Sequence, residues 1–210
     1  SDAAGPHARS VAAVAAARIA SVHRQLGRHA VAQGYDQTAF GLSADTDEGR
    51  FDALLGLAAD AVGLGDEAGA AEQLEQAREV VAHRPEWWRQ RVRLGWVEAE
   101  LALLRGRPED AVAAAGAAVE LAERSGAPRH VAKGLLFSGV AQIEAGRAEE
   151  AAATLRRAAR LAESLGTVPL QWPVRAVLGA LLAETAPQDS AHSLQIARDA
   201  VRRVAADLPE

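Results

Sequence analysis

The sequence carries a helical pattern that returns at an almost constant interval. In each repeat a small residue is followed by an apolar residue four positions later and by alanine after three more. The four copies are Ala70, Leu74 and Ala77; Ala111, Ala115 and Ala118; Ala151, Leu155 and Ala158; Ser190, Leu194 and Ala197. Their first members are 41, 40 and 39 residues apart. Such a period, with two helices per unit, is typical of a solenoid of stacked helical hairpins.

Composition favours an all-α fold. Only 4% of the residues are aromatic, so alanine must supply much of the packing. Alanine is the best helix former, whereas all-β folds need the β-branched and aromatic residues that are scarce here. A repeat array builds its core between neighbouring units, and we therefore predict one domain, residues 1–210.

Glycine and proline mark the ends of the expected helices. Glycines 27, 65, 106 and 146 follow apolar helical runs and are predicted to adopt the left-handed conformation that ends a helix. Prolines such as Pro108 and Pro128 suit the first turn of the next helix. The expected helices lie near 8–26, 28–42, 47–64, 66–83, 85–105, 107–125, 127–145, 147–165, 169–185 and 188–206. The corresponding units are 8–42, 46–83, 85–125, 127–166 and 168–206.

The two ends of the array differ from its middle. The first unit fits worst, with Asp36 where the other units have an apolar residue or alanine. Terminal units often depart from a repeat pattern because they cap the stack. The last helix is polar on one side, as a solvent-facing cap requires, through His192, Gln195, Asp199, Arg202 and Arg203.

On these residues the chain resembles the tetratricopeptide-repeat family. Gly65, Gly106 and Gly146 stand five residues before Ala70, Ala111 and Ala151, as the turn glycine does in that family, and Gly139 matches a glycine of its first helix. The units exceed the 34 residues of the family and are similar to the units of about 40 residues in the sensor arrays of large bacterial activators like the maltose regulator. The resemblance implies a right-handed α-solenoid of about five antiparallel helix hairpins.

Composition also restricts location and partners. Cysteine is absent, so disulfides and thiolate metal sites are excluded and a cytoplasmic location is expected. No uncharged run approaches the roughly 20 residues that span a bilayer, so no membrane association is expected. With a formal net charge of −5 and no basic stripe, nucleic-acid binding by this segment is not expected. The chain begins with Ser and contains no Met, which suggests a part of a longer protein.

The sequence offers no catalytic motif. Lys133 is the only lysine and follows no glycine-rich loop, so a Walker-type phosphate site is excluded. The segment Gly63–Ala68 superficially fits a dinucleotide fingerprint but joins two expected helices without a strand. No two of the histidines have the spacing of a metal site. We expect no enzyme activity, cofactor or metal.

The resemblance places ligands on the inner face formed by the first helix of each hairpin, which we call the A helix. Carrying the family's groove positions onto this chain gives Asp52, Leu55, Arg93, Trp96, Glu100, Lys133, Leu136, Val140, Trp172, Arg175 and Gly179, with Ser21 and Arg24 from the weaker first unit. Because equivalent positions of consecutive units lie side by side, Arg93, Lys133 and Arg175 are predicted to form a basic ridge. Trp96 and Trp172 would flank the ridge or pack in the core, and both alternatives stay open.

Two functions fit these features. The first is a binding module for a protein or peptide with acidic or carboxylate groups, or for a small effector, as part of a bacterial regulator. The second is a scaffold that self-associates through an apolar end or through its second helices. The poorly matching residues 1–45 could also fold back and occupy the groove.

Overall fold

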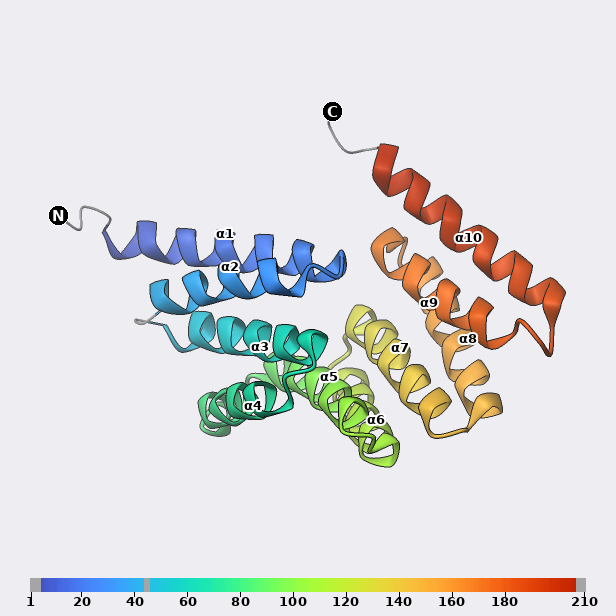
Figure 1. The fold of residues 1–210 in the computed structure, drawn as a ribbon, viewed down its shortest axis with the longest axis horizontal. Coiled ribbons are helices and arrows are strands. Elements are labelled where there is room, and N and C mark those ends of the chain that lie inside the picture. The colour runs from blue at the N-terminus through green and yellow to red at the C-terminus, as the bar shows by residue number, and fades with distance from the viewer. Residues whose placement is uncertain (1–4, 44–45, 207–210) are drawn as a thin grey trace. The chain divides into compact units, whose positions relative to one another are not determined.

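The computed structural model describes residues 5–43 and 46–206, and this part of the chain is all-α (Figure 1). The helices are α1 (Pro6–Gln25), α2 (His29–Leu42), α3 (Asp47–Leu64), α4 (Glu67–Ala82), α5 (Trp88–Leu104), α6 (Pro108–Arg124), α7 (Pro128–Glu144), α8 (Ala148–Ser164), α9 (Val168–Leu181) and α10 (Pro187–Ala206). The predicted fold class is confirmed. The largest differences in the helix ends are that α5 begins at Trp88 instead of residue 85 and α9 ends at Leu181 instead of residue 185.

The chain divides into two compact units, residues 1–105 and 106–210. In the first unit α1 packs on α2 and α3, α2 on α3, and α5 on both α3 and α4, which pack together. In the second unit α6 packs on α7, α7 on α8 and α9, α8 on α9, and α9 on α10. Each helix therefore contacts its close neighbours in sequence, as in a helical repeat. The organisation into a single domain stays a prediction.

Glycine ends α3 for a conformational reason. Gly65 has a φ of 77°, and a Cβ atom added there would have no atom within 4 Å. The left-handed backbone, and not a lack of space, therefore requires glycine at this position. The amide of Asp66 donates to the carbonyl of Ala61 at 2.8 Å, and the Asp66 side chain accepts from the amide of Gly69 at 2.9 Å. The same turn thus ends one helix and caps the next.

The repeat pattern read from the sequence lies inside the protein. Ala70, Leu74 and Ala77 are fully buried, as are Ala151, Leu155 and Ala158. Ala111, Ala115 and Ala118 are 0–3% exposed. In the last copy Ser190 and Ala197 are buried, and Leu194 is half-buried. The predicted helix faces are therefore confirmed.

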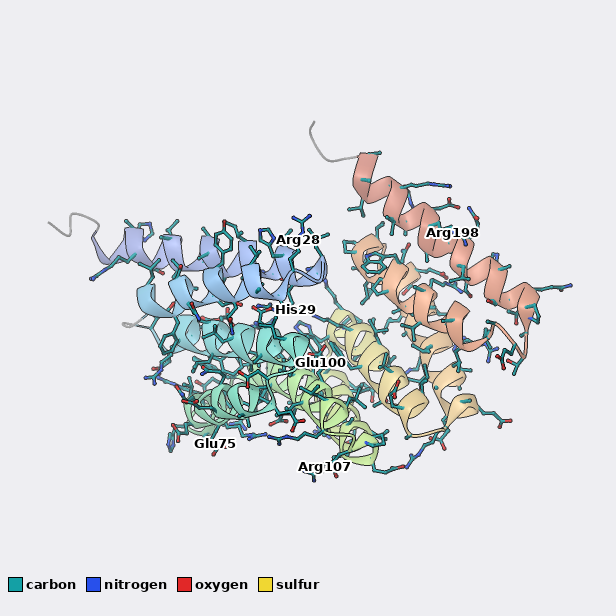
Figure 2. All side chains as sticks on the ribbon, viewed as in Figure 1. Arg28, His29, Glu75, Glu100, Arg107 and Arg198 are labelled. Carbon is teal, nitrogen blue, oxygen red and sulfur yellow. The ribbon has the colours of Figure 1, made fainter. Side chains whose placement is uncertain are left out.

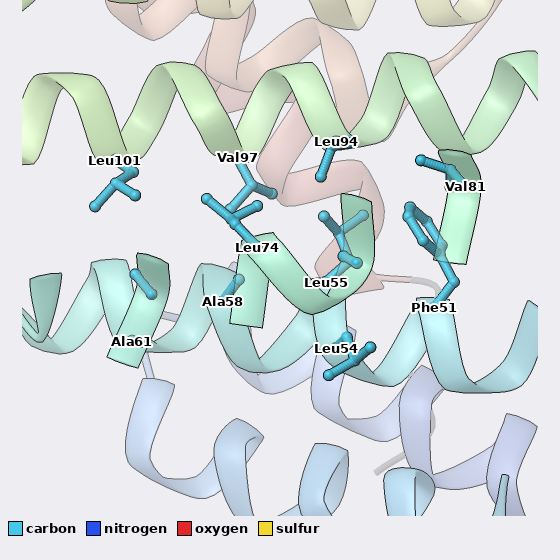
Figure 3. Packing of buried hydrophobic residues seen from close by; sticks show 12 residues of the cluster. Phe51, Leu54, Leu55, Ala58, Ala61, Leu74, Val81, Leu94, Val97 and Leu101 are labelled. Carbon is cyan, nitrogen blue, oxygen red and sulfur yellow. The ribbon is translucent and has the colours of Figure 1, made fainter. Parts of the chain in front are cut away.

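Larger apolar side chains join the helices within each unit. In the first unit Phe51, Leu54, Leu55 and Leu74 pack with residues of α5 between α3, α4 and α5 (Figure 3). In the second unit Leu155 packs against Leu178 and Leu182, which links α8 to α9 and the segment after it. At the junction of α1, α2 and α3 the alanines Ala16, Ala39 and Ala53 form a cluster, against which Ala17 and Phe40 pack. Small side chains therefore supply much of the described apolar packing of the first hairpin.

The predicted polar side of α10 is exposed. His192, Gln195, Asp199, Arg202 and Arg203 all face solvent, and Arg202 pairs with Asp199 at 3.3 Å. Among the described residues no helix is long and apolar enough to cross a membrane.

Two glycines inside helices provide a matched test of the packing. A Cβ atom at Gly139 in α7 would lie 2.6 Å from Cγ of the fully buried Leu155, whereas one at Gly116 in α6 would meet nothing within 4 Å. We expect Gly139→Ala to destabilise the fold by about 1–3 kcal/mol through overpacking. Gly116→Ala should stabilise it by roughly 0.4–1 kcal/mol, because alanine restricts the unfolded chain and favours helix. Urea unfolding measures both, and equal effects of the two substitutions would contradict the packing.

The buried alanine face of α8 allows a second test. Ala158 is fully buried, and Ala153 on the same helix is exposed. Leucine at position 158 must displace packed neighbours and should cost about 1–3 kcal/mol of unfolding free energy. Ala153→Leu is the control and should leave the melting temperature nearly unchanged. An unchanged melting temperature for Ala158→Leu would show that the repeat face is assigned incorrectly.

Candidate functional site

A cleft of about 360 Å³ opens in the first unit between the A helices α1 and α3. The C-terminal end of α2 lies at its base. Its lining residues are Ser10, Ala13, Val14, Ala17, Arg18, Ala39, Leu42, Ser43, Thr46, Glu48, Gly49 and Asp52. The cleft owes its volume to the small side chains of α1 and α2, because larger residues at the alanine positions would fill it.

Three charged residues line the cleft, and two of them already have partners. Arg93 on α5 pairs with Asp52 through Nη1 and Oδ1 at 2.5 Å. The Gln90 side chain donates a hydrogen bond to Glu48 at 3.2 Å. Arg18 has no ion-pair or hydrogen-bond partner among the residues that the structure describes. Only Asp52 has a cationic partner, because the Gln90 amide is neutral and leaves the charge of Glu48 in place. Arg18 is the one cationic side chain among the lining residues.

A buried ionic cluster connects α1 to α2 and α3. Arg24 at the end of α1 reaches Asp60 on α3 with two nitrogens, Nε to Oδ1 at 2.8 Å and Nη2 to Oδ2 at 3.1 Å. The same Nη2 contacts Oδ2 of Asp36 on α2. Nδ1 of His29 lies 3.2 Å from Oδ1 of Asp60, and Figure 2 shows His29 between α2 and α3. One guanidinium thus joins two carboxylates that are 0–1% exposed.

The helix backbones leave room for this cluster. A Cβ atom at Gly56 of α3 would lie 2.2 Å from Oδ2 of Asp36, and one at Gly63 would lie 2.4 Å from the ring of His29. Glycine at these two positions therefore lets α2 approach α3 with polar side chains in between. The ionic cluster thus lies at the same junction as the alanine cluster of α1, α2 and α3.

Burial changes the ionisation of the cluster. The pKa of Asp36 is raised to about 7. Desolvation is the main cause, the neighbouring charge of Asp60 also raises the pKa, and the charge of Arg24 opposes the shift. For Arg24 desolvation acts against the charged form, but the hydrogen bonds and charges of Asp60 and Asp36 outweigh it and raise the pKa of the guanidinium. One guanidinium therefore does not fully compensate the negative charges of two buried carboxylates.

The predicted groove residues of the first unit differ in how far they are exposed to solvent. Asp52 and Arg93 lie at the surface and form the ion pair that borders the cleft. Arg24 is 23% exposed and points into the ionic cluster. Trp96 is 6% exposed and Leu55 is 4% exposed, so Trp96 takes the buried alternative. Ser21 and Glu100 are half-buried.

In the second unit the predicted residues come from α7 and α9. Lys133 is exposed, with Nζ 5.9 Å from the centroid of the Phe137 ring. Arg175 is 15% exposed and pairs with Glu163 of α8. Leu136 packs partly against the core cluster of this unit, Val140 and Trp172 are half-buried, and Gly179 is buried. A ridge that also includes Arg93 of the first unit stays a prediction.

Reasoning from the sequence missed the cleft arginine and two members of the cluster. Arg18 lies on the A helix α1 but outside the family's groove positions, and His29 and Asp60 carried no motif. The one signal was Asp36, a carboxylate at a position that is apolar in the other units. Among the described residues no group of three or more histidines and carboxylates could hold a metal ion.

The fold is similar to that of several solved helical repeat proteins. The Rap protein complexed with competence and sporulation factor superimposes with a TM-score of 0.76 at 15% identity, over 87% of this chain and 52% of that one. The apo form of RapI gives a TM-score of 0.67 at 14% identity, over 91% and 71% of the two chains. Tetratricopeptide-like repeats of a kinesin light chain from Podosopora anserina give 0.58 at 16% identity, over 92% and 96%.

These similarities concern the fold. The chain spans about half of the length of the first Rap protein. No protein-family model and no curated protein matches the sequence. The chain has a tetratricopeptide-like fold of helical hairpins, as the sequence resemblance implied.

The raised pKa of Asp36 gives a prediction about pH. A carboxyl group of an unfolded chain titrates near pH 4, so the folded protein binds the proton more tightly between about pH 4 and 7. The stability that Asp36 contributes therefore decreases as the pH rises through this window. Asp36→Asn keeps the shape and removes the ionisation, so we expect it to unfold at a higher temperature than the parent at about pH 8 and to lose this advantage near pH 5.

Thermal unfolding across this pH range measures the effect. Glu79→Gln, at an exposed position of α4, is the control and should show no such dependence on pH. If Asp36→Asn were less stable than the parent at about pH 8, the ionised carboxylate would be a favourable partner of Arg24 and our account of the cluster would be wrong.

Proposed function

We propose that this chain is a non-catalytic binding module that holds a protein or peptide against its A helices. The observation that carries this proposal is the cleft between α1 and α3, with Arg18 at its edge. Its alanines accept a small apolar group, and Arg18 is the one cationic side chain among its lining residues. A ligand that offers a carboxylate beside a small apolar side chain is complementary to both features.

We propose that Arg18 binds the carboxylate of the ligand. Arginine forms two parallel hydrogen bonds with a carboxylate, and such charge-assisted bonds are stronger than neutral ones. Asp52 does not compete strongly for Arg18, because Arg93 already pairs with it. We therefore propose a peptide C-terminus or an aspartate or glutamate side chain as the group that Arg18 binds.

The ionic cluster supports a binding function more than a catalytic one. Arg24, His29, Asp36 and Asp60 direct their polar atoms at each other, and both carboxylates are buried. A catalytic acid or base must reach a substrate, whereas these groups fix the hairpin against α3. The cluster thus positions the cleft and takes no part in a reaction.

The similar Rap structure contains competence and sporulation factor, so a fold of this kind can hold a partner molecule. We extend this to the present chain as a proposal: the module acts as the sensing or interaction part of a bacterial regulator in the cytoplasm. We also keep Lys133 and Arg175, on the A helices of the second unit, as proposed contacts for an acidic ligand of that unit; Arg175 already pairs with Glu163.

Binding can be tested with an array of short peptides that vary in their last residues. We expect peptides that end in a small apolar residue and a free carboxylate, or that contain an acidic side chain beside it, to bind. Arg18→Glu should weaken this binding at least about tenfold, because it places a negative charge against the carboxylate. Arg160→Glu, at an exposed position of α8, is the matched control and should bind as the parent does; α8 is the second helix of its hairpin, which we call the B helix.

Amidated peptides separate the two kinds of carboxylate. Loss of binding on amidation identifies the C-terminus as the ligand group, and retained binding identifies the acidic side chain. If Arg18→Glu and Arg160→Glu bind the selected peptides equally well, the cleft is not the site and the proposal fails.

A further inference from the structure

The first hairpin has a second apolar surface on the outer side of α1. We call it the outer seam, and it consists of Ala8, Ala12, Ala15, Ile19, Val22 and Leu26, all of which are exposed. Ile19 is 42% exposed, Val22 56% and Leu26 61%. Val11 lies beside the seam and is also exposed. Large apolar side chains that gather on one exposed helix face mark an interaction surface.

The seam differs from the two other sides of α1. Ala13, Ala16 and Ala20 are buried against the rest of the unit. The cleft uses Ser10, Val14 and Arg18. At 100° per residue the outer seam occupies a separate arc of the helix, between Arg18 and His23, and contains no charged residue. A ligand in the cleft would leave this arc uncovered.

The spacing of the seam fits a helical partner. Its members follow each other at intervals of four, three, four, three and four residues. This 3.5-residue period keeps an apolar line facing a second helix over several turns. Three alanines near the start of α1 allow a close approach of the two backbones, and the larger Ile19, Val22 and Leu26 supply apolar area near its end.

Val31 and Tyr35 of α2 extend the surface. Both are partly exposed, and the Tyr35 ring stacks on the His23 ring with 5.6 Å between centroids. His23 borders the outer seam, so this stack joins the exposed side of α2 to it. The hairpin thus presents exposed apolar side chains on both of its helices, and the His23–Tyr35 stack links the two.

The charge of the hairpin indicates the kind of partner. Between residues 5 and 43 the arginines are Arg9, Arg18, Arg24 and Arg28, and the only carboxylate is Asp36, which is 1% exposed. The hairpin therefore presents positive charge, although the whole chain has a formal net charge of −5. Figure 2 shows Arg28 at the turn between α1 and α2, next to the end of the seam.

Two other occupants fit these observations less well. A second copy that paired through the same seam would bring arginines of both copies together without an exposed carboxylate to neutralise them. An anionic membrane would attract the arginines, but α1 contains no Phe, Tyr or Trp, the residues with which interfacial helices enter the lipid. An acidic amphipathic helix matches both the apolar spacing of the seam and the positive charge of the hairpin.

We propose that the outer seam binds an amphipathic helix of another protein, with apolar residues at heptad spacing and aspartate or glutamate on both sides of them. The seam residues pack against the apolar line of that helix, and Arg28 contacts its carboxylates. This surface is separate from the cleft between α1 and α3, so the chain can hold a second partner at the same time.

Two designed helical peptides of about three heptads test the proposal. Both carry leucine at positions a and d, and one has glutamate and the other lysine at positions e and g. We expect the parent chain to bind the glutamate peptide at least about tenfold more tightly in fluorescence anisotropy, and added salt should weaken the binding. A protein of net negative charge would favour the lysine peptide if only its overall charge mattered.

Substitutions separate the seam from other surfaces. Val22→Glu should abolish binding of the glutamate peptide, while Val201→Glu on α10, where valine is 47% exposed, should not affect it. Arg28→Glu leaves the seam intact and should shift the preference towards the lysine peptide. Circular dichroism checks that each variant keeps its helical content, which the exposure of these positions predicts.

Three results would overturn the proposal. The first is an equal affinity for both peptides, or binding that survives Val22→Glu. The second is a dimer of the parent chain in analytical ultracentrifugation that Val22→Glu dissociates, which would assign the seam to self-association. The third is Val22-dependent binding to phosphatidylserine-containing vesicles without binding of the glutamate peptide, which would assign it to a lipid surface.

Discussion

The close approach of A and B helices through small residues is the constraint on which the remaining structure depends. Leu155 of α8 enters the space that Gly139 leaves on α7, and Leu194 of α10 does the same at Gly179 of α9. A Cβ atom at either glycine would lie 2.6–2.7 Å from the leucine Cγ. Because protein interiors are close-packed, such contacts fix how each hairpin closes and therefore which side chains remain outside.

In the first hairpin, charged side chains also contribute to the packing of α1 and α2 on α3. Asp36 stands where the other units use apolar residues, and Gly56 gives its carboxylate the space that it needs. Arg24 and His29 contact the buried carboxylates, so that the cluster fixes one relative position of α1, α2 and α3. The cleft lies on the same three helices, and its shape depends on that position. Because the pKa of the buried Asp36 is raised, the packing of this hairpin is expected to respond to pH.

Much of the fold could be predicted from the sequence because its signals are local. Glycine and proline marked most helix ends, and the repeat spacing identified the buried faces. At the start of α5 the local signal was misleading: Pro85 suggested a helix, but the amide of Trp87 donates to the carbonyl of Arg84 in a turn, and the helix begins at Trp88. Equivalent positions of neighbouring units were expected side by side, and the ion pair of Asp52 and Arg93 confirms this for α3 and α5.

The site was less predictable because it depends on contacts between distant residues. Arg24 was expected to face a ligand, yet it turns towards Asp60, 36 positions away, and no spacing rule gives that preference. Arg18 was not singled out, since an exposed arginine on a helix is ordinary until a cleft is known beside it. Trp96 illustrates the opposite case, because its large ring fits a surface or a core equally well in sequence, and only packing decides between them.

Hydrogen–deuterium exchange of the chain, with and without a bound peptide selected from a random library, tests the central claim that the A helices form the binding surface. The account predicts slower exchange in the cleft segments of α1 and α3, and no change in the B helices α4, α6 and α8. Slower exchange confined to those B helices, with α1 and α3 unaffected, would contradict it.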